Sequence, residues 1–216
     1  MYWNTIDENR KKLLEKITER ISLNNYYMIG GTALSLQLGL RLSYDFDFCV
    51  PEMFNNEVLL EELKEIGKIE IKQNQRGTCD VILDRVQVSF FYYPNKMIEQ
   101  YVTNEEIPNL KMASIIDIAI MKIVAIGGRG ARKDFFDLYN IINQLDIKTL
   151  DLAKGLIKKC GNDINYASVI MGLSYFEDAE QEILPETFVE YDWDEIKNFF
   201  INFQKEFQDE MNKLVD

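Results

Sequence analysis

Two carboxylates separated by a single residue, Asp45 and Asp47, are the feature of this sequence that most directly suggests chemistry. Alternation along a strand would place both on one face and would turn Phe46 and Phe48 to the other. Their Cα atoms would then be roughly 7 Å apart, so together they could hold metal ions separated by about 3.5 to 4 Å. An isolated Asp-x-Asp is more often a solvated edge strand, so the interpretation depends on the surrounding residues.

The chain contains no histidine, which limits both the metal and the mechanism. Ser/His/Asp and Cys/His nucleophiles and imidazole metal sites are all excluded. Any metal must be held by oxygen, and oxygen ligands favour Mg²⁺, Mn²⁺ or Ca²⁺ over zinc or copper. For two-metal phosphoryl chemistry at the acidic pair we expect Mg²⁺, or Mn²⁺.

A pair of glycines precedes the acids. Gly30 and Gly31 follow a short apolar run and open a helical pattern, where unpaired amides could bind phosphate together with Thr32. Taken alone, such a pair is often only a tight turn. Arg41 and Ser43 stand between the glycines and the acids and are further candidates for nucleotide binding.

A second candidate cluster lies in the C-terminal half. Lys122 falls in an apolar helical stretch, where an unpaired ammonium is costly, while Asp134 and Asp137 share one face of the next helix. One interpretation is an ion pair between Lys122 and Asp134. The other makes Lys122 a phosphate ligand and Asp134 either its orienting residue or a general base. Arg129, Lys133 and Asp137 are the associated nucleotide-binding candidates.

The apolar patterning predicts an α+β fold in two lobes, an α/β lobe over residues 1–108 and a helical lobe over residues 109–216. In the first lobe we expect helices at 7–22, 33–40 and 56–66, and a mixed sheet of strands at 26–29, 44–50, 69–72, 78–83 and 86–93. In the second we expect helices at 114–126, 131–145, 150–160, 164–182 and 192–214, with Gly127 and Gly128 breaking the chain after the first.

Composition narrows the partners. A net charge of −12 and a pI near 4.6 argue against a protein that coats nucleic acid, although a small ligand or a local basic patch stays open. Three widely spaced cysteines indicate a reducing compartment. With neither a signal-like N-terminus nor an apolar run long enough to span a bilayer, we expect a cytoplasmic protein without a membrane partner.

In combination, these motifs resemble the AbiEii/AbiGii toxin family of nucleotidyltransferases, in the DNA polymerase β superfamily. The segments that carry the resemblance are, in order, residues 30–34, residues 41–48, Lys122 and residues 129–139. The resemblance implies a polymerase β-like lobe, with Asp45 and Asp47 as metal ligands. It also implies transfer of a nucleotide from an NTP, with Lys122 and Asp134 in catalytic roles.

The same resemblance implies a biological setting, namely the toxin of a toxin-antitoxin or phage-defence (abortive infection) system with a cognate antitoxin. The implied acceptor is RNA, a tRNA end or a protein, and a tRNA would be gripped at Arg129, Arg132 and Lys133. The base of the NTP does not follow from the resemblance.

One position departs from the superfamily pattern. A third carboxylate is usual on a later strand, but the candidate strand carries Ser89 there, so Asp80 or a residue of the helical lobe would have to substitute. Two other functions therefore stay open. One is a small-molecule nucleotidyltransferase of the antibiotic-modifying kind, and the other is a non-catalytic module that binds a nucleotide or a partner.

Overall fold

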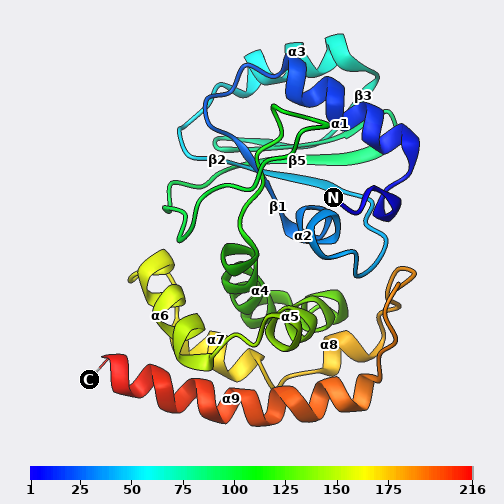
Figure 1. Cartoon of the computed structure of the whole chain (residues 1–216). Helices are drawn as coiled ribbons and strands as arrows, with labels where there is room; N and C mark the ends of the chain where they lie inside the picture. Colours follow the sequence, from blue (N-terminus) through cyan, green and yellow to red (C-terminus); the bar gives the residue numbers. More distant parts are fainter. Residues whose placement is uncertain (216) are drawn as a thin grey trace. The chain divides into compact units, whose positions relative to one another are not determined.

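The computed structural model describes residues 1–215, which form two compact units, Met1–Ser114 and Ile115 onward (Figure 1). The expected boundary after residue 108 lies too early. Residues 109–114 belong to the first unit because Met112 forms a parallel bridge with Met28 and an antiparallel bridge with Val102. The two units are called here the N-terminal unit and the helical unit.

The N-terminal unit contains the expected mixed sheet. Its strands are β1 (Tyr27–Ile29), β2 (Phe46–Val50), β3 (Ile69–Gln75), β4 (Thr78–Leu83) and β5 (Val86–Tyr92). They are ordered β1-β2-β5-β4-β3, with β2 and β5 parallel and the other neighbours antiparallel. The β4–β5 turn at Asp84 and Arg85 has φ values of 45° and 72°, the positive values that a tight two-residue hairpin requires.

The helices of this unit lie on both faces of the sheet. After η1 (Trp3–Thr5), they are α1 (Glu8–Arg20), α2 (Gly30–Leu38) and α3 (Asn56–Ile66). Figure 1 shows α1 and α3 over one face and α2 at the other. The face beneath α1 and α3 is apolar, because alternate strand residues such as Phe46, Phe48 and Phe90 are fully buried. The intervening residues, Asp47 among them, therefore project from the opposite face.

Strand β2 begins at Phe46, two residues later than the pattern predicted. The carbonyls of the two preceding residues are engaged elsewhere. The Tyr44 carbonyl accepts from Arg10 Nε at 3.0 Å, and the Asp45 carbonyl accepts from the Thr32 hydroxyl. A backbone held by side chains in this way cannot continue the ladder, so Asp45 lies just outside the strand.

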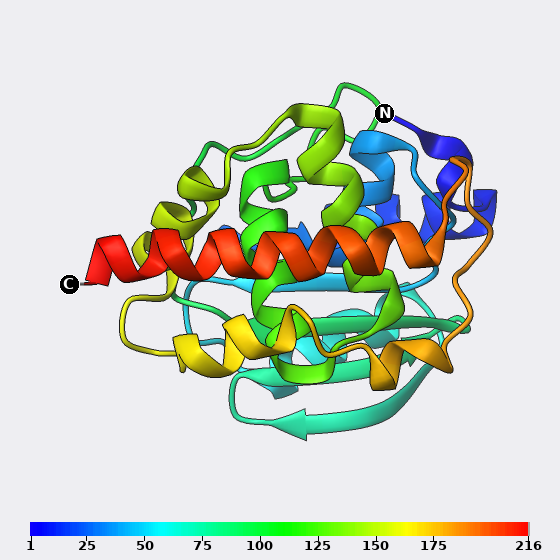
Figure 2. The same ribbon diagram turned by 90° about the horizontal axis from the view of Figure 1, so that it is seen from below.

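The helical unit contains α4 (Ile115–Arg129), α5 (Arg132–Leu145), α6 (Thr149–Cys160), α7 (Tyr166–Gly172), α8 (Glu177–Glu180) and α9 (Trp193–Val215). Figure 2 shows α9 running across this unit, and it packs against α5, α6 and α7. Its contacts come from a helical stripe that includes the fully buried Ile196, Phe200 and Phe207. Across the described residues, no helix has both the length and the apolar character that a membrane crossing needs.

Two expectations for the helical unit were wrong, and both involve glycine. Helix α4 continues through Gly127 and Gly128 instead of breaking there. A Cβ atom at Gly127 would lie 2.6 Å from Val169 Cα, so the bare backbone lets α7 approach closely. The segment 164–182 forms two helices, and α7 ends at Gly172, where a Cβ atom would lie 2.6 Å from Gly127 Cα. Glycine therefore serves packing between helices at these positions.

Candidate functional site

The acidic pair lies at the start of β2. Asp47 is in register with Ile29 of β1 and Ser89 of β5. Its carboxylate rests on the first residue of α2, because a Cβ atom at Gly30 would lie only 2.7 Å from Asp47 Oδ2. Gly30 also has φ of 74°, which other residues rarely adopt. Glycine is thus required here both for backbone conformation and for the close approach of the carboxylate.

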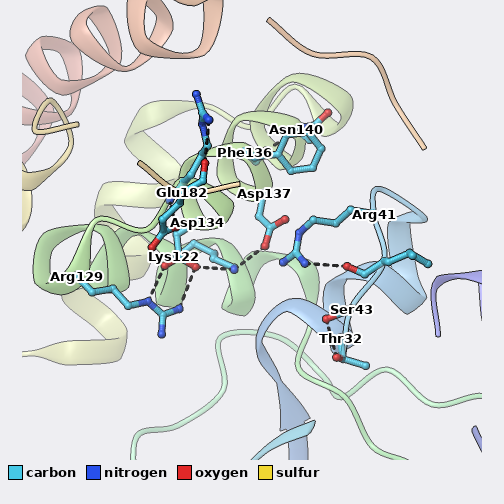
Figure 3. A network of polar contacts seen from close by, with 12 residues as sticks. Thr32, Arg41, Ser43, Lys122, Arg129, Asp134, Phe136, Asp137, Asn140 and Glu182 are labelled. Carbon is cyan, nitrogen blue, oxygen red and sulfur yellow. Dashed lines mark hydrogen bonds and ion pairs between the residues drawn. The ribbon is translucent and has the colours of Figure 1, made fainter. Parts of the chain in front are cut away.

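The main chain of Asp45 is fixed by two buried hydroxyls. Thr32 donates to the Asp45 carbonyl and hydrogen-bonds with Ser43, their oxygens 2.8 Å apart (Figure 3). Thr32 is 1% exposed and Ser43 is 7% exposed, so this connection lies inside the unit. The hydroxyls therefore position Asp45, which is half-buried like Asp47, while their contact with a nucleotide stays a prediction.

A buried arginine supplies positive charge at the beginning of α2. Arg41 is 2% exposed and its Nη1 donates to the Leu42 carbonyl at 3.1 Å. A Cβ atom at Gly31 would lie 2.5 Å from Arg41 Nη2, so the guanidinium packs directly over that glycine. The amides at a helix N-terminus already attract anions, and a guanidinium beside them strengthens that attraction. This end of α2 is suited to phosphate.

The donor set of this region fits a hard cation. Asp45 and Asp47 are half-buried carboxylates, and Mg²⁺ commonly keeps several waters while binding one or two carboxylates and the phosphates of its substrate. Among residues 1–215, no three His, Cys, Asp or Glu side chains gather closely enough to hold an ion by themselves. A cation bound here would take Asp45 and Asp47 as its protein ligands, with waters and substrate oxygens as the others.

The position of the missing third acid is defined by strand register. Ser89 lies beside Asp47 across the parallel β2–β5 pair, and Asp80 lies beside Ser89 across the β4–β5 pair. Neighbouring strands are about 4.8 Å apart, so Asp80 is two strand spacings from Asp47. Serine thus occupies the place next to the acidic pair, and Asp80 stands one strand further away.

The second cluster is a buried charge network inside the helical unit. Lys122, 4% exposed, places its Nζ 2.8 Å from Asp134 Oδ1 and 2.6 Å from Asp137 Oδ2 (Figure 3). Arg129 adds hydrogen bonds to Asp134 from Nε at 2.8 Å and from Nη2 at 3.1 Å. The ion pair expected between Lys122 and Asp134 is present, and Asp137 shares it because α5 presents both acids on one face.

These contacts decide what Asp134 can do. Burial raises the pKa of Asp134, but the Lys122 ammonium and the Arg129 guanidinium outweigh it and lower the pKa to about 2. A carboxylate with so low a pKa is a poor proton acceptor at neutral pH, since a general base works best with a pKa near the operating pH. Asp134 is therefore better suited to orienting Lys122 than to serving as the base.

The proposed basic patch is largely engaged within its own unit. Arg129 is bound to Asp134, as described above. Arg132 donates its backbone N–H to the Glu182 carboxylate at 2.8 Å and its Nη1 to the Glu182 carbonyl at 2.9 Å, while its guanidinium lies 4.5 Å from the centre of the Trp193 ring. Lys133 is half-buried. No local sequence pattern pointed to Glu182, which lies 50 residues beyond Arg132 in the chain.

Comparison with known proteins places these features in a family. The sequence model of the nucleotidyl transferase AbiEii toxin family, assigned to type IV toxin-antitoxin systems, matches residues 12–214. The chain is similar to the uncharacterized protein aq_aa25 of Aquifex aeolicus (strain VF5), with 32% identity over 204 residues that cover 94% of this chain and 97% of that protein.

Two crystal structures of Helicobacter pylori proteins share the fold. JHP933 matches with a TM-score of 0.55 at 18% identity, over 97% of this chain and 96% of that one. A second protein, assigned provisionally as a nucleotidyltransferase, matches with a TM-score of 0.54 at 18% identity, over 95% and 96% of the two chains. The predicted α+β architecture, a nucleotidyltransferase lobe with a mixed sheet followed by helices, is confirmed.

Proposed function

This chain belongs to the nucleotidyl transferase AbiEii toxin family, and from that premise we propose that it transfers a nucleotide from an NTP to an acceptor hydroxyl in a cation-dependent reaction. The family's type IV toxin-antitoxin assignment implies an antitoxin partner. The observation that carries the proposal is the contact between Asp47 and Gly30, because it brings a half-buried carboxylate against a helix end that is suited to phosphate.

The proposed reaction is attack of the acceptor oxygen on the α-phosphorus of the NTP. A bond forms between that oxygen and the α-phosphorus, the bond to the bridging oxygen of the β-phosphate breaks, and pyrophosphate leaves. The hydroxyl proton passes to solvent. Mg²⁺ or Mn²⁺, when bound, neutralises charge on the phosphates, the dominant need in phosphoryl transfer.

The residues of the N-terminal unit have separate roles in binding the cation and the phosphates. Asp45 and Asp47 hold the cation, and the amides of Gly30 and Gly31 bind phosphate. Arg41 adds positive charge beside those amides, at a position where it is already packed on the glycine backbone. Thr32 and Ser43 keep Asp45 in place through its carbonyl.

For the helical unit we propose a positioning role. Asp134 and Asp137 hold the Lys122 ammonium in one place, and Arg129 keeps Asp134 ionised. A fixed ammonium stabilises developing negative charge without first having to reorganise, which is how preorganised groups lower a barrier. Lys122 is therefore proposed to stabilise the transferred group, with Asp134 and Asp137 acting through it.

The proposal for the acceptor rests on the family and on the distribution of positive charge. A net charge of −12 and the internal engagement of Arg129 and Arg132 leave little positive surface for a long nucleic acid. A short RNA end, such as the terminus of a tRNA, would need few phosphate contacts. We therefore propose an RNA end as the acceptor, and expression of the chain alone should then slow bacterial growth.

The test is to incubate the protein with each of the four labelled NTPs, Mg²⁺ or Mn²⁺, and total RNA, and to identify what becomes labelled. The wild type should label one RNA class and release pyrophosphate, and Asp45→Asn and Asp47→Asn should do neither while remaining folded. Glu70→Gln is the matched control, because it also removes one carboxylate but from an exposed site on β3.

The alternatives give different outcomes in the same experiment. Pyrophosphate release that depends on a small-molecule acceptor, with unlabelled RNA, would identify a small-molecule nucleotidyltransferase. Stabilisation by an NTP without pyrophosphate release from any acceptor would identify a non-catalytic binding module. Full activity of the double variant Asp45→Asn/Asp47→Asn would overturn the assignment of the cation site.

A further inference from the structure

A row of polar side chains crosses the sheet on the face opposite α1 and α3. Asp47 of β2, Ser89 of β5 and Asp80 of β4 are consecutive partners in register, so their side chains project from the same face. Ser89 is 2% exposed and Asp80 is half-buried. The row therefore brings a third carboxylate towards the acidic pair, with a short side chain between them.

One oxygen of Asp80 is unsatisfied. Its Oδ1 atom is buried, and among the described residues no hydrogen-bond donor reaches it. Most buried polar atoms have a partner, because leaving one without hydrogen bonds is costly. A carboxylate oxygen is an acceptor only, so its missing partner must be a donor or a cation.

Among the described residues, Asp80 is not gathered with Asp45 and Asp47 into one ion-binding group. The Cα atoms of Asp47 and Asp80 are two strand spacings, about 10 Å, apart. Ser89 carries no charge of its own between the two carboxylates. A water molecule bound to the cation would supply the donor that Asp80 Oδ1 lacks.

We propose that Asp80 is the third carboxylate of the cation site, acting from the neighbouring strand through a cation-bound water. This inference rests on the proposed function, because it takes Asp45 and Asp47 as the direct ligands. Asp80 is then a positioning residue. It keeps a negative charge near the cation although the position beside Asp47 carries no acid.

The experiment measures Mn²⁺ binding to the intact chain without nucleotide, from the electron paramagnetic resonance signal of free Mn²⁺. Loss of a partner that acts through a metal-bound group typically weakens metal binding about 10- to 100-fold, so Asp80→Asn should weaken Mn²⁺ binding by that factor. Glu70→Gln is the control. It removes a carboxylate from the same face, since Glu70 pairs with Ile82, two residues along β4 from Asp80, but its side chain is exposed.

A second variant keeps the test independent of folding. Ser89→Asp places a carboxylate beside Asp47, so it should tighten Mn²⁺ binding and should restore binding in the Asp80→Asn background. Asp80→Asn should also raise the Tm of the metal-free protein, because it removes a buried charge whose Oδ1 lacks a donor. A merely structural role for Asp80 would lower that Tm and leave Mn²⁺ affinity unchanged.

The outcomes separate this inference from the proposed function. If Asp47→Asn weakens Mn²⁺ binding and Asp80→Asn does not, the acidic pair stands and the role of Asp80 is refuted. If neither variant weakens binding, the cation site of the proposed function is itself wrong. If Ser89→Asp fails to restore binding to Asp80→Asn, the two positions do not serve the same cation and the inference is overturned.

Discussion

Replacement of Lys122 by methionine tests how far the helical unit depends on its buried charges. Methionine keeps an unbranched apolar chain but removes the ammonium, which lies 2.8 Å from Asp134 Oδ1 and 2.6 Å from Asp137 Oδ2. Those two side chains are 0% and 1% exposed, so water cannot replace the lost cation easily. Breaking a buried pair in this way costs about 3–5 kcal/mol.

Asp134 retains Arg129 in this variant, so we expect the lower end of that range, about 3 kcal/mol. For a chain of this size each kcal/mol corresponds to about 2–4 °C in Tm, which gives a fall of about 6–12 °C. The assay is thermal and urea denaturation followed by circular dichroism. Lys154→Met is the control, because Lys154 is an exposed lysine of α6 and its loss should change stability by less than about 0.5 kcal/mol.

A Lys122→Met protein as stable as the control would refute the reasoning, since it would mean that Asp134 and Asp137 do not depend on the Lys122 ammonium for compensation of their charge. The variant also separates structure from chemistry when transfer is measured at a temperature where it remains folded. Loss of transfer under that condition supports the proposed role of Lys122 in stabilising the transferred group. Unchanged transfer would make the network purely structural.

Further predictions concern pH, glycine packing and ligand binding. The pKa of Asp134 is lowered to about 2, so its ionised form contributes on the order of 2 kcal/mol to the free energy of unfolding. That contribution is complete above about pH 4 and is lost as the pH falls towards 2. Denaturation at pH 5 and pH 2.5 should show this loss in the wild type and a smaller loss in Asp134→Asn. Gly127→Ala should lower Tm because its Cβ would meet α7, whereas Gly128→Ala, whose Cβ would meet nothing within 4 Å, should raise stability by up to about 1 kcal/mol. Mg²⁺ with the correct NTP at about 100 times its Kd should add about 2.7 kcal/mol, measured as a rise in Tm that Asp47→Asn abolishes. Growth inhibition on expression without an antitoxin should vanish in Asp45→Asn at matched protein level. Equal growth of the strains that express wild type and Asp45→Asn would refute the toxin role but not the proposed enzymatic activity.

Elements with strong local signals could be predicted from the sequence. Helix α3 (Asn56–Ile66) has its expected bounds because the Asn55 side chain caps its first turn and Gly67 follows its end. Strand β4 (Thr78–Leu83) also has its expected bounds, since buried and half-buried residues alternate along it. In both cases the information lies within a few residues of the element.

The errors arose where distant segments decide the structure. The continuation of α4 through Gly127 depends on Val169 of α7, and the membership of residues 109–114 depends on bridges to Met28 and Val102. No local pattern reports such contacts. Gly127 and Gly128 were therefore predicted to break a helix that packing keeps intact. The boundary between the two units was likewise placed too early, because the bridges of Met112 could not be foreseen.

The candidate site also has one part that local sequence predicts and one part that long-range strand pairing decides. The proximity of Gly30, Asp45 and Asp47 followed from the spacing of consecutive elements. The row of Asp47, Ser89 and Asp80 did not, because it requires β5 to insert between β2 and β4 in the sheet. Register of this kind is set by long-range strand pairing, so the unsatisfied Asp80 oxygen is visible only in three dimensions.

The central claim is that Asp45 and Asp47 support transfer of the α-phosphoryl group together with its nucleoside. The most direct measurement compares NTP labelled at the α-phosphorus with NTP labelled at the γ-phosphorus, each incubated with total RNA and Mg²⁺. We expect acceptor labelling from the α-label alone, release of the γ-label in pyrophosphate, and neither in Asp47→Asn. Acceptor labelling from the γ-phosphorus, or α-labelling that persists in Asp45→Asn/Asp47→Asn, would contradict it.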